Sequence, residues 1–286
     1  MSAQPETATL APEVRWRLPF NPWHLVLFPT AVLFALPLIW LVLSSFMSNA
    51  QINQFPPTII PDSLHLDGWK TVLGDSDFPR WFLNSTIVAL VTVVSNVVFC
   101  ALAGYAFARM RFRGSTVLFL LILLTLIIPF QVTMIPTFIV MDWLGLVDTL
   151  GALIIPALVL PLGVFLMRQF FVNLPAEIEE AARIDGCSRL GVLLHVAAPL
   201  ARPALAALAA LTFLLEWNDL LWPLIAISSD QNATLPLGLT TFQGQHTQDF
   251  SAVMAGNVIT VTPVLIAFLL AQRTFIESLT ASAVKG

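Results

Sequence analysis

Long apolar stretches alternate with shorter polar segments along most of the chain. Crossing the roughly 30 Å hydrocarbon core of a bilayer takes about 20 residues of apolar helix, and six stretches approach or exceed that length. They cover residues 25–46, 81–108, 117–140, 150–167, 203–227 and 253–272. The pattern therefore predicts an all-α membrane protein with six transmembrane helices.

The composition agrees with a chain embedded in lipid. Of the 286 residues, 57% are hydrophobic and 10% are charged, whereas a soluble domain carries about 25% charged residues. A charge at the centre of a spanning helix costs about 2.5–3.5 kcal/mol, which explains the deficit. No basic stripe indicates a nucleic-acid partner. Two cysteines are too few for a disulfide framework, so we expect both to be free thiols.

The first apolar stretch has a second interpretation, a cleaved signal peptide. Its apolar run is longer than the roughly 7–15 residues of a signal core, and 24 residues precede it. We therefore prefer an uncleaved membrane anchor.

Lysines and arginines predict the orientation of the helices, because cytoplasmic loops are enriched in both. One side of the predicted membrane holds only Lys70 and Arg80, which leaves 11 of the 13 basic residues for the other side. That basic side includes both termini and the loops 109–116 and 168–202, so we expect these segments in the cytoplasm. The outer loops are then expected at residues 47–80, 141–149 and 228–252.

The longest predicted cytoplasmic loop contains a charged segment, residues 175–203. Pro175 suits the first turn of a helix, because its missing N–H would have no partner there. Gly186 suits the left-handed residue that ends such a helix. The segment therefore predicts a short helix, a turn at Gly186 and a second helix over about 188–198. By itself, the pattern also fits a helix that lies on the inner leaflet with solvated charges.

Residues Glu180-Ala181-Ala182, followed by Gly186 and Pro199, resemble the EAA motif of ABC importer permeases. Val196 and Ala198 stand where the family has isoleucine and leucine. Further segments match the same family in the same order along the chain: residues 105–109, 128–131, 135–136, 144–149, 216–223 and 284–286. The chain is thus similar to the six-span permease of a carbohydrate-uptake ABC importer.

The resemblance implies a division of the chain and a set of partners. Residues 1–24 would form a cytoplasmic N-terminal tail, 25–274 the permease domain with its coupling loop at 168–202, and 275–286 a cytoplasmic C-terminal tail. The chain would form half of a translocation path in the bacterial cytoplasmic (inner) membrane. Its partners would be membrane lipid, a second permease, two ABC ATP-binding subunits and an extracytoplasmic sugar-binding protein that meets the loop 228–252. We expect a heterodimer with the second permease, and a homodimer stays open.

The helix with the EAA residues would be the coupling helix, which docks in a cleft of the ATP-binding subunit. Its coupling residues would be Glu180, Ala181, Ala182, Asp185 and Gly186. The chain has no Gly-Lys pair and hence no phosphate-binding loop, and it has no metal motif or nucleophile constellation. ATP would therefore be bound by the partner ATPase, this chain would hold no cofactor, and we predict that it is not an enzyme.

Some polar side chains fall within the predicted spans, where ionisable residues usually face a cavity or the bundle interior. They are Asn84, Gln131, Glu216, Asn218 and Asp219. One interpretation is that they line the translocation path. The other is that they form hydrogen bonds between helices, each worth about 0.6–2 kcal/mol. The sequence leaves both interpretations open, most evenly for Glu216 and Asp219.

The predicted cargo is a sugar or oligosaccharide. An ABC permease for glycerol phosphate or a polyol is an alternative, although no arginine within a span is available to bind an anion. A secondary transporter driven by an ion gradient is a third hypothesis. Such a transporter favours inverted repeats, and it would leave the charged cytoplasmic helix without a role.

Overall fold

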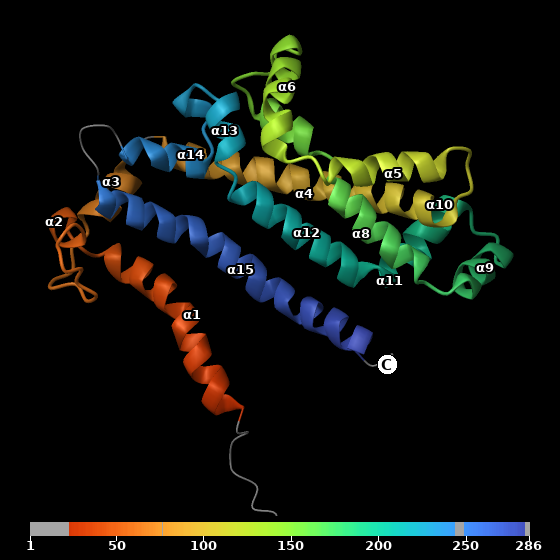
Figure 1. Ribbon diagram of the computed structural model, residues 1–286, viewed down its shortest axis with the longest axis horizontal. Helices are drawn as coiled ribbons and strands as arrows, with labels where there is room; N and C mark the ends of the chain where they lie inside the picture. The colour runs from red at the N-terminus through yellow and green to blue at the C-terminus, as the bar shows by residue number, and fades with distance from the viewer. Residues whose placement is uncertain (1–22, 76, 244–248, 284–286) are drawn as a thin grey trace, which may run out of the picture.

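The computed structural model describes residues 23–75, 77–243 and 249–283, and this part of the chain is helical without a β-strand. Its main body contains α4 (Phe78–Arg109), α8 (Pro161–Val172), α12 (Arg202–Trp217) and α15 (Phe250–Ala283) (Figure 1). Helix α4 packs against α8 and α12, and α12 packs against α15. The predicted all-α membrane architecture is confirmed. The predicted N-terminal tail, apart from its last two residues, lies outside the described part of the chain.

Helix α1 (His24–Ser44) stands beside α15 at the edge of the bundle (Figure 1). It is apolar, and nearly all of its side chains are exposed in the isolated chain, as expected of a helix that lipid or another subunit covers. The shorter helices are α2 (Asn49–Ile52), α3 (Asp67–Gly74), α5 (Ser115–Thr125), α6 (Phe130–Trp143), α7 (Leu150–Ile154), α9 (Ala176–Ile184), α10 (Arg189–Val192), α11 (Ala198–Leu200), α13 (Leu221–Ala226) and α14 (Leu235–Leu239).

The number of spans depends on two bent pairs of helices. Within the described residues, four segments are long and apolar enough to cross a membrane: His24–Ser44, Phe78–Arg109, Leu150–Val172 and Phe250–Leu270. The pair α5 and α6 is bent by 104°, and the pair Arg189–Leu200 and Arg202–Trp217 is bent by 79°. If each bent pair is one span, the total is six, as the sequence predicts.

The predicted third span, 117–140, differs from a straight helix. Helix α5 ends at Thr125, and α6 begins after Pro129, whose extended backbone (ψ 139°) and missing N–H end the helical hydrogen bonding. As a result α6 projects away from the main body, while α5 lies against α8 (Figure 1). The predicted fifth span, 203–227, is also divided, because α12 ends at Trp217 and α13 begins only at Leu221.

The predicted fourth span is interrupted, and a buried asparagine stabilises the break. Between α7 and α8 the chain forms a single 3-10 turn at Ile155–Ala157, before Pro161 opens α8. The Asn96 amide nitrogen donates to the Ala157 carbonyl oxygen at 2.8 Å, and the Asn96 side-chain oxygen accepts from the Leu160 N–H at 2.6 Å. Backbone groups freed at the break are thus paired, as a lipid environment requires.

Two apolar cores lie along the bundle. We call them outer and inner after the orientation that the basic residues predict. The outer core gathers Trp81, Trp217, Trp222 and Leu235 with their neighbours, and the inner core gathers residues such as Cys100, Tyr105, Met167, Phe171 and Leu208. Close contact at the inner core requires a small residue on α4, since a Cβ added to Gly104 would lie 2.6 Å from the Met167 Cβ. Small residues permit this kind of approach between membrane helices.

Candidate functional site

The predicted helix–glycine–helix is present at α9 and α10. Helix α9 follows Pro175 and ends in a Schellman motif: the Gly186 N–H donates to the Arg183 carbonyl and the Cys187 N–H to the Ala182 carbonyl. Gly186 has φ +89°, in the left-handed region. The second helix differs from the prediction, because α10 has only four residues and a π-turn, Leu193–Ala197, follows it before α11.

Most of the predicted coupling residues lie on an open surface. Glu180, Ala181, Asp185 and Gly186 are exposed, whereas Ala182 is partly buried against the inner core. Ile184, at the end of α9, is 86% exposed.

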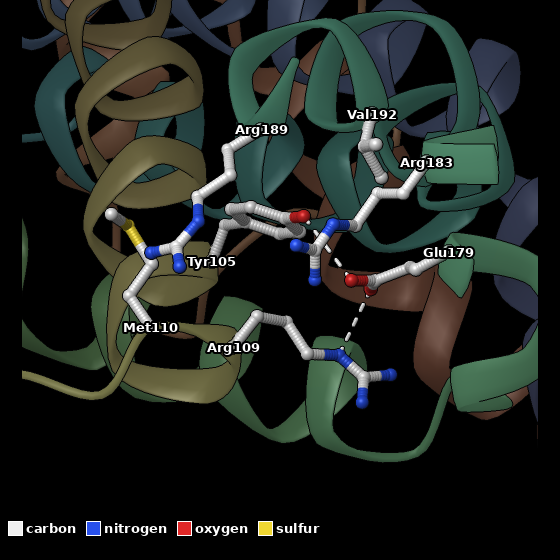
Figure 2. Close-up of a pocket in the computed structure, with 7 residues that line it drawn as sticks. All are labelled: Tyr105, Arg109, Met110, Glu179, Arg183, Arg189 and Val192. Atoms are coloured by element: carbon white, nitrogen blue, oxygen red, sulfur yellow. Dashed lines mark hydrogen bonds and ion pairs between the residues drawn. The ribbon is translucent and has the colours of Figure 1, made fainter. Parts of the chain in front are cut away.

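The opposite face of α9 turns toward α4 (Figure 2). The Glu179 carboxylate lies 2.9 Å from the Arg109 Nε, and its second oxygen accepts from the Tyr105 hydroxyl at 3.2 Å. The Arg109 Nε–H and Glu179 oxygen are close without the alignment of a hydrogen bond, so their contact is an ion pair. Arg109 Nη2 also donates to the Leu174 carbonyl oxygen. These side chains border a cavity of about 50 Å³ that Met110, Arg183, Arg189 and Val192 complete.

The EAA motif points to Glu180, whereas the structure shows that Glu179 makes the contact with α4. Consecutive residues on an α-helix point about 100° apart, so only one of the two glutamates faces α4. Tyr105 and Arg109 share a face of α4, because they are four residues apart. The four-residue spacing of Tyr105 and Arg109 could have indicated this polar face of α4. In the sequence, both residues were noted only as part of the family motif at 105–109.

A larger cavity of about 580 Å³ opens among α4, the break between α5 and α6, the break between α7 and α8, and the end of α12. Its lining includes Asn96, Glu216, Asp219 and Trp222. The other lining residues are Thr125, Leu126, Ile128, Phe130, Thr133, Leu153, Pro156, Ala157, Val159, Leu160, Pro161, Thr212 and Leu215. The lining contains two carboxylates and no lysine or arginine.

The predicted path residues divide into two groups. Glu216 and Asp219 come together at this cavity, and the Asp219 carboxylate also accepts from the Leu221 N–H at 3.1 Å at the start of α13. Asn84, Gln131 and Asn218 are not among the lining residues. Asn218 is exposed and donates to the Leu214 carbonyl of its own helix, and Gln131 is exposed on α6.

Asn84 does not line the cavity and forms hydrogen bonds with the predicted outer loop, residues 228–252. It is 6% exposed, and its amide nitrogen donates to the carbonyl oxygens of Gln231 and Ala233, both at 2.9 Å. One turn before Asn84, the Trp81 indole donates to the Asp230 carbonyl at 2.8 Å. The next residue after Asn84, Ser85, accepts through its hydroxyl from the Leu235 N–H, also at 2.8 Å. The first turns of α4 therefore fix residues 230–235.

Asp148 fixes the same loop from the other side. Its carboxylate accepts from the N–H groups of Ser228 and Ser229 and from the Ser229 hydroxyl, at 2.9–3.0 Å. These bonds, led by the Ser229 N–H, hold the pKa of Asp148 below its usual range. Asp148 adopts φ +61°, a conformation that aspartate tolerates better than most residues.

The described residues contain no cluster of His, Cys, Asp and Glu that would hold a metal ion. Cys100 and Cys187 are both free thiols, as predicted.

Sequence comparison places these sites in a family. The profile of the family described as "Binding-protein-dependent transport system inner membrane component" matches residues 96–278. The arabinooligosaccharides transport system permease protein AraQ of Halalkalibacterium halodurans is 40% identical over 253 residues, covering 87% of this chain and 91% of that protein. The sn-glycerol-3-phosphate permease UgpE of Pectobacterium atrosepticum is 35% identical, covering 88% and 92%. The lactose permease LacG of Rhizobium radiobacter is 30% identical, covering 94% and 98%.

Solved structures share the fold. A bacterial ABC transporter that imports the acidic polysaccharide alginate has a chain with a TM-score of 0.76 and 26% identity, covering 87% of this chain and 93% of that chain. A chain of the alginate transporter in complex with its alginate pentasaccharide-bound periplasmic protein gives a TM-score of 0.64 at 13% identity, covering 87% and 91%.

Proposed function

The chain belongs to the family of binding-protein-dependent transport system inner membrane components, the permeases of ABC importers, which are not enzymes, and we propose that it forms half of the translocation path for a neutral sugar or oligosaccharide. In this proposal, α9 is the coupling helix and a separate ATPase supplies the energy. The observation that carries the proposal is the exposed EAA segment, Glu180 to Gly186, on a helix attached to the inner core.

The geometry of α9 supports docking of an ATP-binding subunit there. Ala181 adds little bulk beyond the backbone, so a partner can approach closely, and Ile184 offers an apolar contact. Glu180 and Asp185 add charged acceptors for hydrogen bonds from the partner. Ala198, which replaces a larger apolar residue of the motif, packs against the inner core, so the substitution lies behind the docking surface rather than on it.

The cavity with Glu216 and Asp219 is the best candidate for this chain's half of the path. It lies where α5, α6 and α8 are bent or interrupted, and broken helices in membrane proteins leave backbone polar groups facing a cavity. Asn218 and Gln131 lie near these elements without lining the cavity. Asn84 is engaged with the outer loop, so we assign it a structural role rather than a place on the path.

The lining charges favour a neutral cargo. An anionic solute would meet two carboxylates and no cationic side chain on this half of the path. Relatives named for arabinooligosaccharides and lactose agree with a sugar, while the relative named for sn-glycerol 3-phosphate keeps that anion, and by extension a polyol, as the alternative. Membership of an ABC permease family disfavours the third hypothesis, an ion-driven transporter.

The proposal includes the remaining partners. Two ATP-binding subunits would dock at the cytoplasmic face, a second permease would complete the path, and an extracytoplasmic sugar-binding protein would meet the outer loops. The solved alginate importer in complex with its periplasmic protein supports the last partner. Both termini would be cytoplasmic, as the distribution of basic residues indicates.

Replacing Gly186 by valine tests the coupling assignment. A β-branched residue is strongly disfavoured at φ +89°, so the turn after α9 should change. We expect sugar uptake by cells that depend on this permease to fall at least about tenfold, with unchanged affinity of the binding protein for the sugar. The matched control is Gly114→Val, because Gly114 has φ +83° with open space around it but lies outside α9. Normal uptake by the Gly186 variant would contradict the assignment.

The cargo is tested by competition in the same cells. Uptake of a labelled oligosaccharide should be inhibited by neutral sugars and not by sn-glycerol 3-phosphate. Glu216→Gln and Asp219→Asn should change uptake without changing the amount of assembled transporter. Loss of assembly in these variants would assign the two carboxylates to the fold instead of the path.

A further inference from the structure

Helix α9 has no buried residue, so apolar packing alone does little to fix its direction. Ala182 makes partial contact with the inner core from the side of α9 that faces the bundle. Helix α9 also contacts α10 and the π-turn Leu193–Ala197. Polar side-chain contacts join it in addition to α4.

Three side chains connect α9 to the inner end of α4, and we call this set the tether: Tyr105, Arg109 and Glu179 (Figure 2). Arg109 contacts the Glu179 carboxylate on α9 and the Leu174 carbonyl in the segment that leads into the helix. The two contacts therefore hold both the helix and its entry against the end of α4. The side chains of Arg109 and Glu179 are only 18% and 14% exposed, so water screens their attraction less than it screens a surface pair.

The outer end of the same helix is fixed to another segment. Trp81, Asn84 and Ser85 hold the loop 230–235 through backbone hydrogen bonds. Between these residues and the tether, α4 is a continuous helix, and its single proline, Pro79, is in the first turn. Its 32 residues correspond to roughly 48 Å. One unbroken helix thus connects the outer loop to the proposed coupling helix.

We propose that α4 is the transmission rod of this permease: the tether sets the direction of α9 against the ATPase, and Trp81, Asn84 and Ser85 carry the movement of α4 to the outer loop. The inference rests on the proposed function of α9. It assigns Tyr105, Arg109 and Glu179 as positioning residues. A displacement of α9 moves α4 along with it, and α4 moves the loop 230–235.

Removing the tether should uncouple hydrolysis from uptake. In the complete transporter, reconstituted in liposomes with its ATPase and binding protein, the measured quantity is sugar imported per ATP hydrolysed. Glu179→Gln and Arg109→Gln should each lower this ratio about tenfold. The matched control is Arg111→Gln, which removes a nearby exposed charge outside the tether. The exchange Arg109→Glu with Glu179→Arg should recover much of the ratio, because it restores the ion pair. An unchanged ratio in the single variants would overturn the proposal.

The outer attachment is tested with Asn84→Leu, which removes both amide bonds to the loop. This variant should also lower the ratio, and combining it with Glu179→Gln should add little, because both changes interrupt one rod. Fully additive losses would show that the two ends act independently, as distant sites normally do, and would overturn the rod.

A third measurement needs no partner. Cys187 lies directly after the Gly186 turn and is partly buried, whereas Cys100 is completely buried. In membranes that contain only this chain, Glu179→Gln should raise the rate of maleimide labelling of Cys187 several-fold, because α9 pivots. An unchanged rate would show that the tether does not orient α9. If the rate rises but Gly186→Val leaves uptake normal, the coupling assignment fails and the tether stands as a structural contact.

Discussion

The outer loop 228–235 and the inner segment 175–192 are both polar connections between apolar helices, yet the chain stabilises them differently. The outer loop is held from both sides: α4 pairs the backbone of residues 230–235 through Trp81, Asn84 and Ser85, and Asp148 pairs residues 228–229. The inner segment has a few polar contacts, and Ile184 is exposed. The outer loop is paired within this chain, whereas the inner surface stays exposed, as the proposed docking of an ATP-binding subunit requires.

The largest effect on the stability of the chain itself is expected from Asn84→Leu. The substitution leaves the carbonyls of Gln231 and Ala233 unpaired in a buried site, which should lower the free energy of unfolding by about 2 kcal/mol. Unfolding by denaturant in detergent micelles measures the change. Asn218→Leu is the control, because the exposed Asn218 amide bonds only within α12. If both variants lose the same free energy of unfolding, the Asn84 bonds to the outer loop stabilise the chain no more than a surface hydrogen bond does.

A smaller effect is expected from acid at the outer loop. Burial raises the pKa of Asp249, but hydrogen bonds from Ser251, Ala252 and Asn49 outweigh burial and leave its pKa lowered, as that of Asp148 is. A carboxylate with a lowered folded-state pKa adds stability above its unfolded pKa of about 3.9, and this stability is lost as pH falls through the folded pKa.

Protection from hydrogen exchange, measured relative to the intrinsic exchange rate at each pH, should therefore fall at residues 228–235 and 249–252 below about pH 4. In Asp148→Asn the pH dependence at residues 228–229 should disappear, while that at residues 249–252 should remain. A pH dependence at residues 228–229 that persists in this variant would show that Asp148 is not its source.

The smallest effect on stability is expected from Ile184→Ser. Because Ile184 is 86% exposed, the free energy of unfolding should change by less than about 0.5 kcal/mol. Co-purification of the ATP-binding subunit with the permease should nevertheless weaken, since the substitution removes an apolar contact. Phe55→Ser is a control, because Phe55 is equally apolar and 93% exposed in an outer segment. Unweakened association in the Ile184 variant would place the docking surface elsewhere.

The sequence determined the parts of the molecule that depend on local physical chemistry. Apolar runs of sufficient length predicted the membrane helices, and the glycine after a polar helix predicted the left-handed turn at Gly186. Neither feature needs a distant partner, because hydropathy and backbone freedom belong to the residues themselves.

Tertiary structure decided the bends and the roles of the polar side chains. The sequence analysis treated 117–140 and 150–167 as continuous spans, and the structure breaks them before Pro129 and Pro161, because the direction of each segment depends on what it packs against. Asn84 and Asn96 were equivalent in the sequence as polar residues in one span. Only the fold shows that Asn84 holds a loop about 150 positions away, whereas Asn96 pairs the break before α8.

The different roles of Glu179 and Glu180 were also decided by tertiary structure. Both lie near the start of one short polar helix, and the motif drew attention to Glu180. Their difference arises from the angle of α9 to α4, which brings Glu179 to Arg109 and leaves Glu180 exposed. The sequence by itself determined the permease family and predicted a coupling segment at residues 175–203. Only the tertiary structure decided which charges hold that segment and which remain for a partner, because hydrogen bonds and ion pairs join residues that are distant along the chain.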